Sequence, residues 1–246
     1  MANYERIISL VPSLTELVVD LGLKDRLVGR TRFCVHPKDE VDDIPIIGGT
    51  KNPRLEKIKA SNPDYIVANR EENKKEHINE LRQDFKVKVT DIATIEDALI
   101  TIHELGRELK AEEESEKLIG QIHDVMEDIP EEPPLRTAYL IWKDPYMTVG
   151  KDTYIHNVME HWKLENVFGD KTRYPKVTFY DITEKEPDLI LLSSEPYPYK
   201  EKHLSEFEEA FPNTRTLLAE GEWFSWYGSH MLHSFRRLNI WRKAIA

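Results

Sequence analysis

Apolar residues in the first part of the chain form a short continuous run and then a helical stripe. The run at residues 7–11 has the length of a buried strand. Ser13 and Glu16 follow Pro12 with the spacing of a capping box, which predicts a helix that begins at Ser13. The apolar positions of this helix recur at helical spacing: Leu14, Leu17, Val18 and Leu21. Gly22 stands where a left-handed residue would end it.

The same order of elements recurs further along the chain. A short helix around Leu55 and Ile58 precedes a break and a buried strand at residues 65–68. A strand at residues 137–142 precedes a second helical stripe, formed by Ile155, Val158, Met159 and Trp162. Asn62-Pro63-Asp64 and Glu186-Pro187-Asp188 each stand before a buried strand. Alternating strands and helices favour parallel sheets, and the repeated order favours two similar α/β lobes.

Two helical patterns separate the lobes. Thr94 and Asp97 open the first, and the second begins at Glu112 and reaches Asp128. About 17 helical residues would span ~25 Å, which is long enough to brace two lobes. The predicted domains are an N-terminal lobe at residues 1–93, helices at 94–130 including the long inter-lobe helix, and a C-terminal lobe at 131–246.

Composition narrows the classes of partner. The chain has 246 residues with 34 Lys and Arg against 45 Asp and Glu, a formal charge of -11, so no basic field exists to hold nucleic acid or an anionic membrane. No apolar run is long enough to cross a bilayer, and no signal-peptide core follows Met1. We therefore expect a cytoplasmic protein as the sequence stands, or an extracytoplasmic one if a leader was removed. The single cysteine, Cys34, excludes an internal disulfide.

Motifs for nucleotide, dinucleotide, metal and nucleophilic chemistry are missing from the sequence, so we expect no catalytic residues. The most unusual segment is Glu222 to His230, which has four aromatic residues in five positions. As a loop before the last helix, it either offers rings to a planar ligand or packs over its own lobe, and composition weighs these two alternatives equally. Residues 145–150 follow the end of a strand, where open α/β sheets bind ligands, although a simple turn explains them slightly better.

The order of motifs resembles one known family nearly end to end. The motifs that carry the resemblance are Ile8-Ser9-Leu10-Val11-Pro12-Ser13-Leu14-Thr15-Glu16, Leu27-Val28-Gly29-Arg30-Thr31, His36-Pro37, Gly48-Gly49, Asn52-Pro53-Arg54-Leu55-Glu56-Lys57-Ile58, Val149-Gly150-Lys151, Glu165-Asn166-Val167-Phe168 and Tyr174-Pro175-Lys176-Val177. Together they resemble the helical-backbone metal receptors, the class III substrate-binding proteins of ABC importers for cobalamin, iron-siderophore complexes and haem. The resemblance implies two Rossmann-like lobes with parallel sheets, joined by one long backbone helix, with a ligand cleft between the lobes.

The resemblance also implies a set of ligand-binding residues. They are Pro12, Ser13, Phe33, Thr50, Tyr146, Met147, Tyr174, Trp223, Phe224, Trp226 and Tyr227. Thr50 stands where some cobalamin binders have a large aromatic residue, which leaves a different flat metal chelate open. His230 and His233 could ligate a metal, but histidines near a helix end more often cap or pack, so the metal ligands stay unassigned.

Members of this family dock on the importer's membrane subunits through one glutamate from each lobe. Glu56 matches the first, whereas Tyr180 occupies the expected place of the second, next to Asp181. The leading hypothesis is a non-catalytic binding protein for a cobalt corrinoid or ferric chelate, with no intrinsic cofactor. The alternatives are a cytosolic protein for chelate storage or handover and, with less support, a bilobal chelatase-like enzyme that uses His230 or His36.

Overall fold

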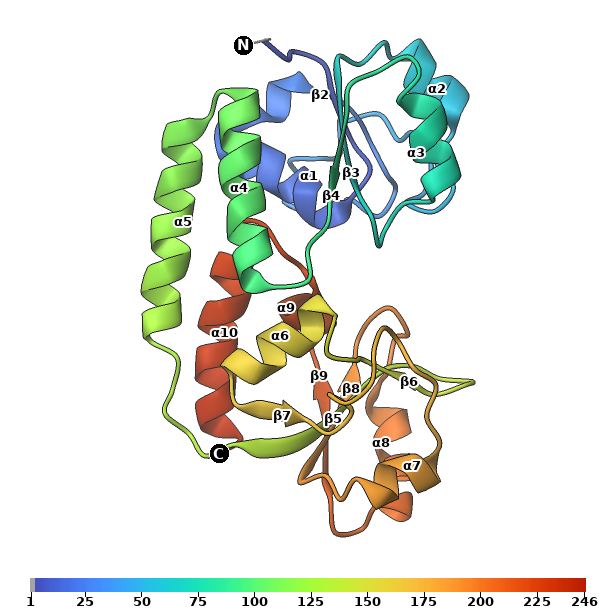
Figure 1. Cartoon of the computed structure of the whole chain (residues 1–246), viewed down its shortest axis with the longest axis vertical. Coiled ribbons are helices and arrows are strands. Elements are labelled where there is room, and N and C mark those ends of the chain that lie inside the picture. The colour runs from blue at the N-terminus through green and yellow to red at the C-terminus, as the bar shows by residue number, and fades with distance from the viewer. Residues whose placement is uncertain (1–2) are drawn as a thin grey trace. The chain divides into compact units, whose positions relative to one another are not determined.

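The computed structural model describes residues 3–246, which form two compact α/β units (Figure 1). The first unit contains the chain up to Ile92, residues 96–123 and residues 227–232. The second contains residues 93–95, 124–226 and 233–246. The short segment 227–232 thus packs with the first unit, although the sequence places it within the C-terminal lobe.

The first unit is built on a parallel four-stranded sheet in the order β2-β1-β3-β4. Its strands are β1 (Ile7–Ser9), β2 (Leu27–Arg30), β3 (Tyr65–Asn69) and β4 (Val87–Thr90). Its helices are α1 (Pro12–Val18), α2 (Leu55–Ala60), α3 (Lys75–Leu81), α4 (Ile95–Leu109) and α5 (Glu112–Glu127), of which α4 and α5 each extend across a boundary between the units. Apolar side chains from β1 and β3 pack with α2 and α3 in one buried cluster, including Ile8, Ile66, Ile58 and Ile78. The two central strands, β1 and β3, are buried along their whole length, as their apolar sequence runs indicate.

The first helix begins one residue earlier than predicted. Pro12 occupies its first turn, and Val11 is the capping residue, without a side-chain cap. The Thr15 amide and hydroxyl both donate to the Val11 carbonyl, each at 2.9 Å. The predicted capping box is wrong, because the Glu16 carboxylate contacts His230 instead of reaching back to the helix start. Gly22 does adopt the left-handed conformation, with φ 76°, in the π-helical turn Val19–Leu23 that follows α1; the 3-10 turn Lys24–Arg26 comes next.

The second unit has a five-stranded sheet in which β7 and β8 pair with β5, β9 pairs with β8 and β6 lies at the edge. Its strands are β5 (Leu135–Trp142), β6 (Met147–Thr148), β7 (Leu164–Asn166), β8 (Leu189–Ser193) and β9 (Arg215–Ala219). Its helices are α6 (Tyr154–His161), α7 (Phe179–Glu184), α8 (Glu201–Ala210), α9 (Gly221–Ser225) and α10 (His230–Ala244), which starts in the first unit. All pairings are parallel except β5 with β6. This exception was not predicted; it arises because a four-residue turn can only return the chain antiparallel.

The predicted repeat is visible in the turn before the central strand of each unit. In the first unit, the Asp64 carboxylate accepts from the Glu5 and Arg6 amides, and the Arg6 side chain donates to the Asn62 and Ser61 carbonyls. In the second, the Asp188 carboxylate accepts from the Arg136 amide, while the Arg136 side chain donates to the Glu186 and Lys185 carbonyls.

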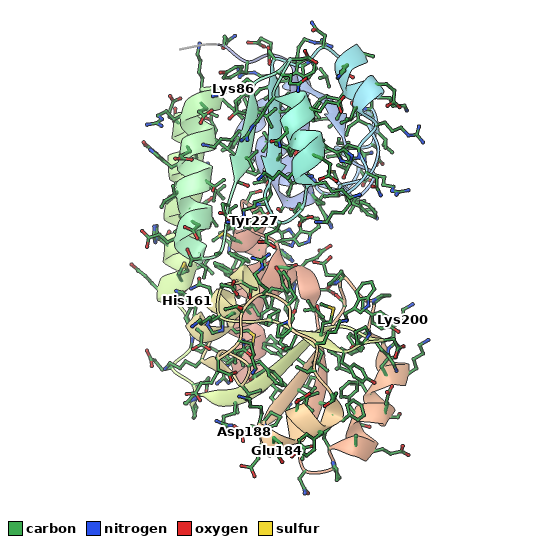
Figure 2. All side chains as sticks on the ribbon, turned by 45° about the vertical axis from the view of Figure 1, so that its right-hand side comes forward. Lys86, His161, Glu184, Asp188, Lys200 and Tyr227 are labelled. Carbon is green, nitrogen blue, oxygen red and sulfur yellow. The ribbon has the colours of Figure 1, made fainter. Side chains whose placement is uncertain are left out.

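The backbone of the two turns agrees as well. Asn62 has φ 43° and Glu186 has φ 44°. Figure 2 shows Asp188 and Glu184 at the same end of the second unit, where β8 begins, and Lys200 away from them. The two units therefore share the same local chemistry at the amino ends of their central strands.

Helices α4 and α5 lie side by side within the first unit (Figure 1). At Gly106 a Cβ atom would lie 2.1 Å from the Ser115 hydroxyl, so this close approach requires glycine. The predicted helix from Glu112 to Asp128 ends one residue earlier, at Glu127. Among residues 3–246, no helix has the length and apolar character needed to cross a bilayer.

Candidate functional site

In the first unit, one asparagine ties together the loops that follow the strands. The Asn73 Nδ2 donates to the carbonyls of Leu10, at 3.2 Å, and Thr50, at 3.1 Å. Its Oδ1 accepts from the Asn69 amide at 2.8 Å. These bonds fix the loops after β1 and β3 and the Gly-Gly turn at one edge of the sheet. The carboxyl edge of a parallel sheet is where open α/β folds bind ligands.

The predicted ligand residues of the first unit lie along this edge. Ser13 and Thr50 are buried, and Pro12 is half-buried at the start of α1. Phe33, which follows β2, is 52% exposed and approaches the Gly48-Gly49 turn. Gly48 has φ 122°, and a Cβ there would lie 2.8 Å from the Arg54 amide nitrogen, so this turn requires glycine. An exposed phenyl ring on an ordered backbone is suited to contact a flat ligand.

Glu72 also lies at this edge, three residues after the end of β3 and next to Asn73. Its amide donates to the Asn69 side chain. Burial raises the pKa of the Glu72 carboxyl above its ordinary value, and the nearby Lys51 opposes that effect. Keeping this carboxylate ionised therefore costs folding free energy at neutral pH.

A Glu72→Gln variant tests whether the buried carboxylate lowers the stability of the protein at neutral pH. Because the pKa of this carboxyl is higher in the folded than in the unfolded protein, its protonated form favours the folded state. That stabilisation is fully present below the pKa of the unfolded protein and is lost as the pH rises through the pKa of the folded protein. We expect Glu72→Gln to be more stable than the unmodified protein at pH 7 to 8, with the difference shrinking as the pH falls. Urea unfolding of both proteins at several pH values measures this difference in the free energy of unfolding. Glu76→Gln, on the exposed first turn of α3, is the control; equal pH profiles for both variants would contradict a buried charge at Glu72.

In the second unit, the predicted residue Tyr146 has structural partners. Its ring stacks on Phe179 at 5.0 Å between centroids, and its hydroxyl donates to Glu206, which Lys143 also contacts. These two hydrogen bonds lower the pKa of the Glu206 carboxyl. Met147 is half-buried in β6, and Tyr174 is half-buried with the Arg173 guanidinium 5.5 Å from its ring centre.

The aromatic segment is not a continuous loop, so the prediction is wrong for its first half. Residues 221–225 form α9, and only the following residues are extended or turn-like before α10. Phe224 is fully buried and packs against Tyr139 and Trp241, with centroid distances of 5.1 and 6.0 Å. Trp223 remains half-buried. Phe224 therefore belongs to the core of the second unit.

A carboxylate positions the end of this segment. The Glu195 Oε1 accepts from the Trp226 Nε1 at 3.0 Å and from the Ser225 hydroxyl at 2.5 Å. Trp226 packs with the second unit, whereas the next residue, Tyr227, packs with the first. Both side chains are mostly buried, at 9% and 6% exposure. The predicted aromatic residues of this segment are therefore divided between the two units.

His230, one of the two histidines left unassigned, is held within the first unit. Its Nδ1 lies 2.9 Å from the Glu16 Oε2, and its ring centre lies 5.8 Å from that of His36. In the part of the chain that the structure describes, no group of three His, Cys, Asp or Glu side chains is arranged to hold a metal ion.

The two predicted docking positions are equivalent in their helices. Glu56 is the second residue of α2 and Tyr180 the second residue of α7; both are exposed, Tyr180 at 70%. In each helix an isoleucine two residues later, Ile58 or Ile182, is fully buried. Asp181 caps α7 by accepting from the Thr178 amide and hydroxyl, which lowers the pKa of its carboxyl. Asp181 is therefore engaged at the helix start.

The fold defines a class of protein with two α/β units, each built on a largely parallel sheet. The family model described as periplasmic binding protein matches residues 7–218. The chain belongs to this family, which confirms the resemblance inferred from its motifs.

Known proteins of this family are similar along most of the chain. An uncharacterized ABC transporter substrate-binding lipoprotein of Bacillus subtilis is 27% identical over 201 residues, which are 76% of this chain but only 63% of the lipoprotein. The vitamin B12-binding protein of Pectobacterium atrosepticum is 23% identical over 93% of this chain and 85% of its own length. The fold matches that of a periplasmic heme binding protein from Pseudomonas aeruginosa with a TM-score of 0.82 at 16% identity, covering 99% and 94% of the two chains.

Three charged residues beside the predicted site were missed from the sequence. Glu72 and Glu195 each follow a buried strand, and Arg32 comes directly before the predicted Phe33. All three could have been found in the sequence because each comes shortly after a strand. The carboxyl ends of parallel strands lie at the edge of the sheet where open α/β folds bind ligands.

Proposed function

We propose that this protein binds a metal chelate, a cobalt corrinoid or a ferric complex, as the substrate-binding component of an ABC importer. The observation that carries the proposal is the family match, which extends over 212 of 246 positions in both units. Relatives named for vitamin B12 and a similar fold named for heme support a flat metal chelate as the ligand class.

The residues of the first unit support the same ligand class. Phe33 presents an exposed ring next to the Gly48-Gly49 turn, while the buried polar residues Ser13 and Thr50 lie just after β1 and just after that turn. An apolar ring with a few fixed polar groups is the usual composition of a small-molecule site. The protein supplies binding and orientation in this proposal, and it catalyses no reaction.

Titration with chelates tests this function. We expect native mass spectrometry to give one bound chelate per chain with cyanocobalamin, haem or a ferric hydroxamate, and we expect the bound chromophore to quench tryptophan fluorescence. Trp226→Ala should weaken that binding by about 1–3 kcal/mol, the range for an anchor side chain. Trp226→Phe, which retains a ring but loses the bond to Glu195, should lose less. Absence of binding and quenching with every chelate would contradict the proposed function.

A further inference from the structure

Arg32 is held in a defined position at the carboxyl edge of the sheet in the first unit. It follows β2 by two residues, and its amide donates to the Gly48 carbonyl at 2.9 Å. Its guanidinium carbon lies 5.1 Å from the centre of the Phe33 ring. A Cβ at Gly49 would lie 3.2 Å from the Arg32 Nη2 and 3.5 Å from the Phe33 ring, so both side chains pack closely on the glycine backbone.

Three other cations near this edge have partners. Arg70 pairs with Asp91 at 2.6 Å, Lys51 donates to the Glu71 carbonyl, and Lys74 donates to the Asn52 side chain. For Arg32, no carboxylate within residues 3–246 lies within 4.0 Å. The planar donors of Arg32 are free to form a fork with a carboxylate.

Stacking on Phe33 prepares Arg32 for that role. A guanidinium over an aromatic face gains a cation–π contact while its in-plane N–H groups remain available. Because Phe33 and Gly49 restrict the side chain, less conformational freedom is lost when a ligand binds. Arg32, Phe33 and the Gly48-Gly49 turn therefore combine a flat apolar surface with a fixed cation.

We propose that Arg32 binds a carboxylate carried by the chelate, so that the protein selects carboxylate-bearing metal chelates over those that carry only amides or hydroxamates. This inference rests on the proposed function and specifies the ligand class. A bidentate arginine–carboxylate pair is stronger than an arginine–amide contact, because both partners are charged. Porphyrin propionates and ferric hydroxycarboxylates both supply the required group.

Matched ligands and variants test the inference. Haem is compared with haem dimethyl ester, which retains the ring and iron but lacks carboxylates, and ferric citrate is compared with a ferric hydroxamate. One of these two pairs will contain the ligand that the protein prefers. Within that pair, we expect Arg32→Gln to weaken binding of the ligand that carries carboxylates, haem or ferric citrate, by about 10- to 100-fold. Binding of the matched ligand without free carboxylates, haem dimethyl ester or the ferric hydroxamate, should change little. The two pairs distinguish a porphyrin from a hydroxycarboxylate ligand. Arg70→Gln, which changes an ion-paired arginine at the same edge, should change affinity less than about twofold.

The outcomes separate the inference from the function on which it rests. Loss of selectivity in Arg32→Gln, with an unchanged far-UV spectrum and unfolding midpoint, would support the inference. The inference would be overturned if haem bound as tightly as its ester and ferric citrate bound as tightly as the hydroxamate. It would also be overturned if Arg32→Gln bound these ligands with unchanged affinity. Either result would leave the proposed chelate binding intact. Binding of no chelate by the unmodified protein would overturn both.

Discussion

Phe224→Ala is expected to lower the free energy of unfolding by about 3–5 kcal/mol, the usual cost of truncating a buried phenylalanine. The Phe224 ring has no exposed area and lies between Tyr139 of β5 and Trp241 of α10. Its loss would leave a cavity between the sheet and the last helix that the aromatic neighbours cannot fill without leaving their rotamers. Urea unfolding followed by circular dichroism measures the change.

The same substitution at Phe33 is the control. Phe33 is 52% exposed, so Phe33→Ala should change stability by no more than about 0.5 kcal/mol while it weakens chelate binding. If Phe224→Ala unfolded like the unmodified protein but no longer bound chelates, Phe224 would be a ligand contact, as the family resemblance implies, and its assignment to the core would be wrong.

The paired architecture was predictable because it depends on local signals that occur twice. Pro-Asp before a buried strand marks a turn, and in both units the Asp carboxylate accepts backbone amides at the amino end of the sheet. Continuous apolar runs identified the central strands, and the acidic start of α5 identified that helix within one residue. Such signals involve neighbours in the sequence and need no knowledge of distant contacts.

The errors occurred where distant residues compete for a side chain. Ser13 and Glu16 have the spacing of a capping box, but Glu16 contacts His230, more than two hundred residues away. In the aromatic segment, Phe224 packs with rings from β5 and α10, which allows the helix α9 where the composition indicated a loop. The position of Arg32 after β2 could have marked it from the sequence, but its contact with the Phe33 ring became visible only in the structure.

Docking on a conventional importer should fail for the unmodified protein and recover in part in Tyr180→Glu. The family resemblance implies one carboxylate from each lobe against arginines of the membrane subunits. Glu56 provides the first, and Tyr180 takes the equivalent place in α7. Asp181 is the nearest carboxylate, but it is engaged in capping α7. Without the second carboxylate, an importer arginine would be buried unpaired, at a cost of several kcal/mol.

The importer, reconstituted in lipid nanodiscs, allows this comparison at micromolar protein concentration. Because Tyr180 is 70% exposed, Tyr180→Glu should leave stability and chelate affinity unchanged. Tyr180→Gln removes the ring without adding charge, so it should not recover docking. Glu56→Gln combined with Tyr180→Glu should abolish the recovered complex, because docking then lacks the first carboxylate. Tight docking of the unmodified protein that depends on Glu56 would refute the requirement for a second carboxylate at position 180 and identify a complete importer subunit.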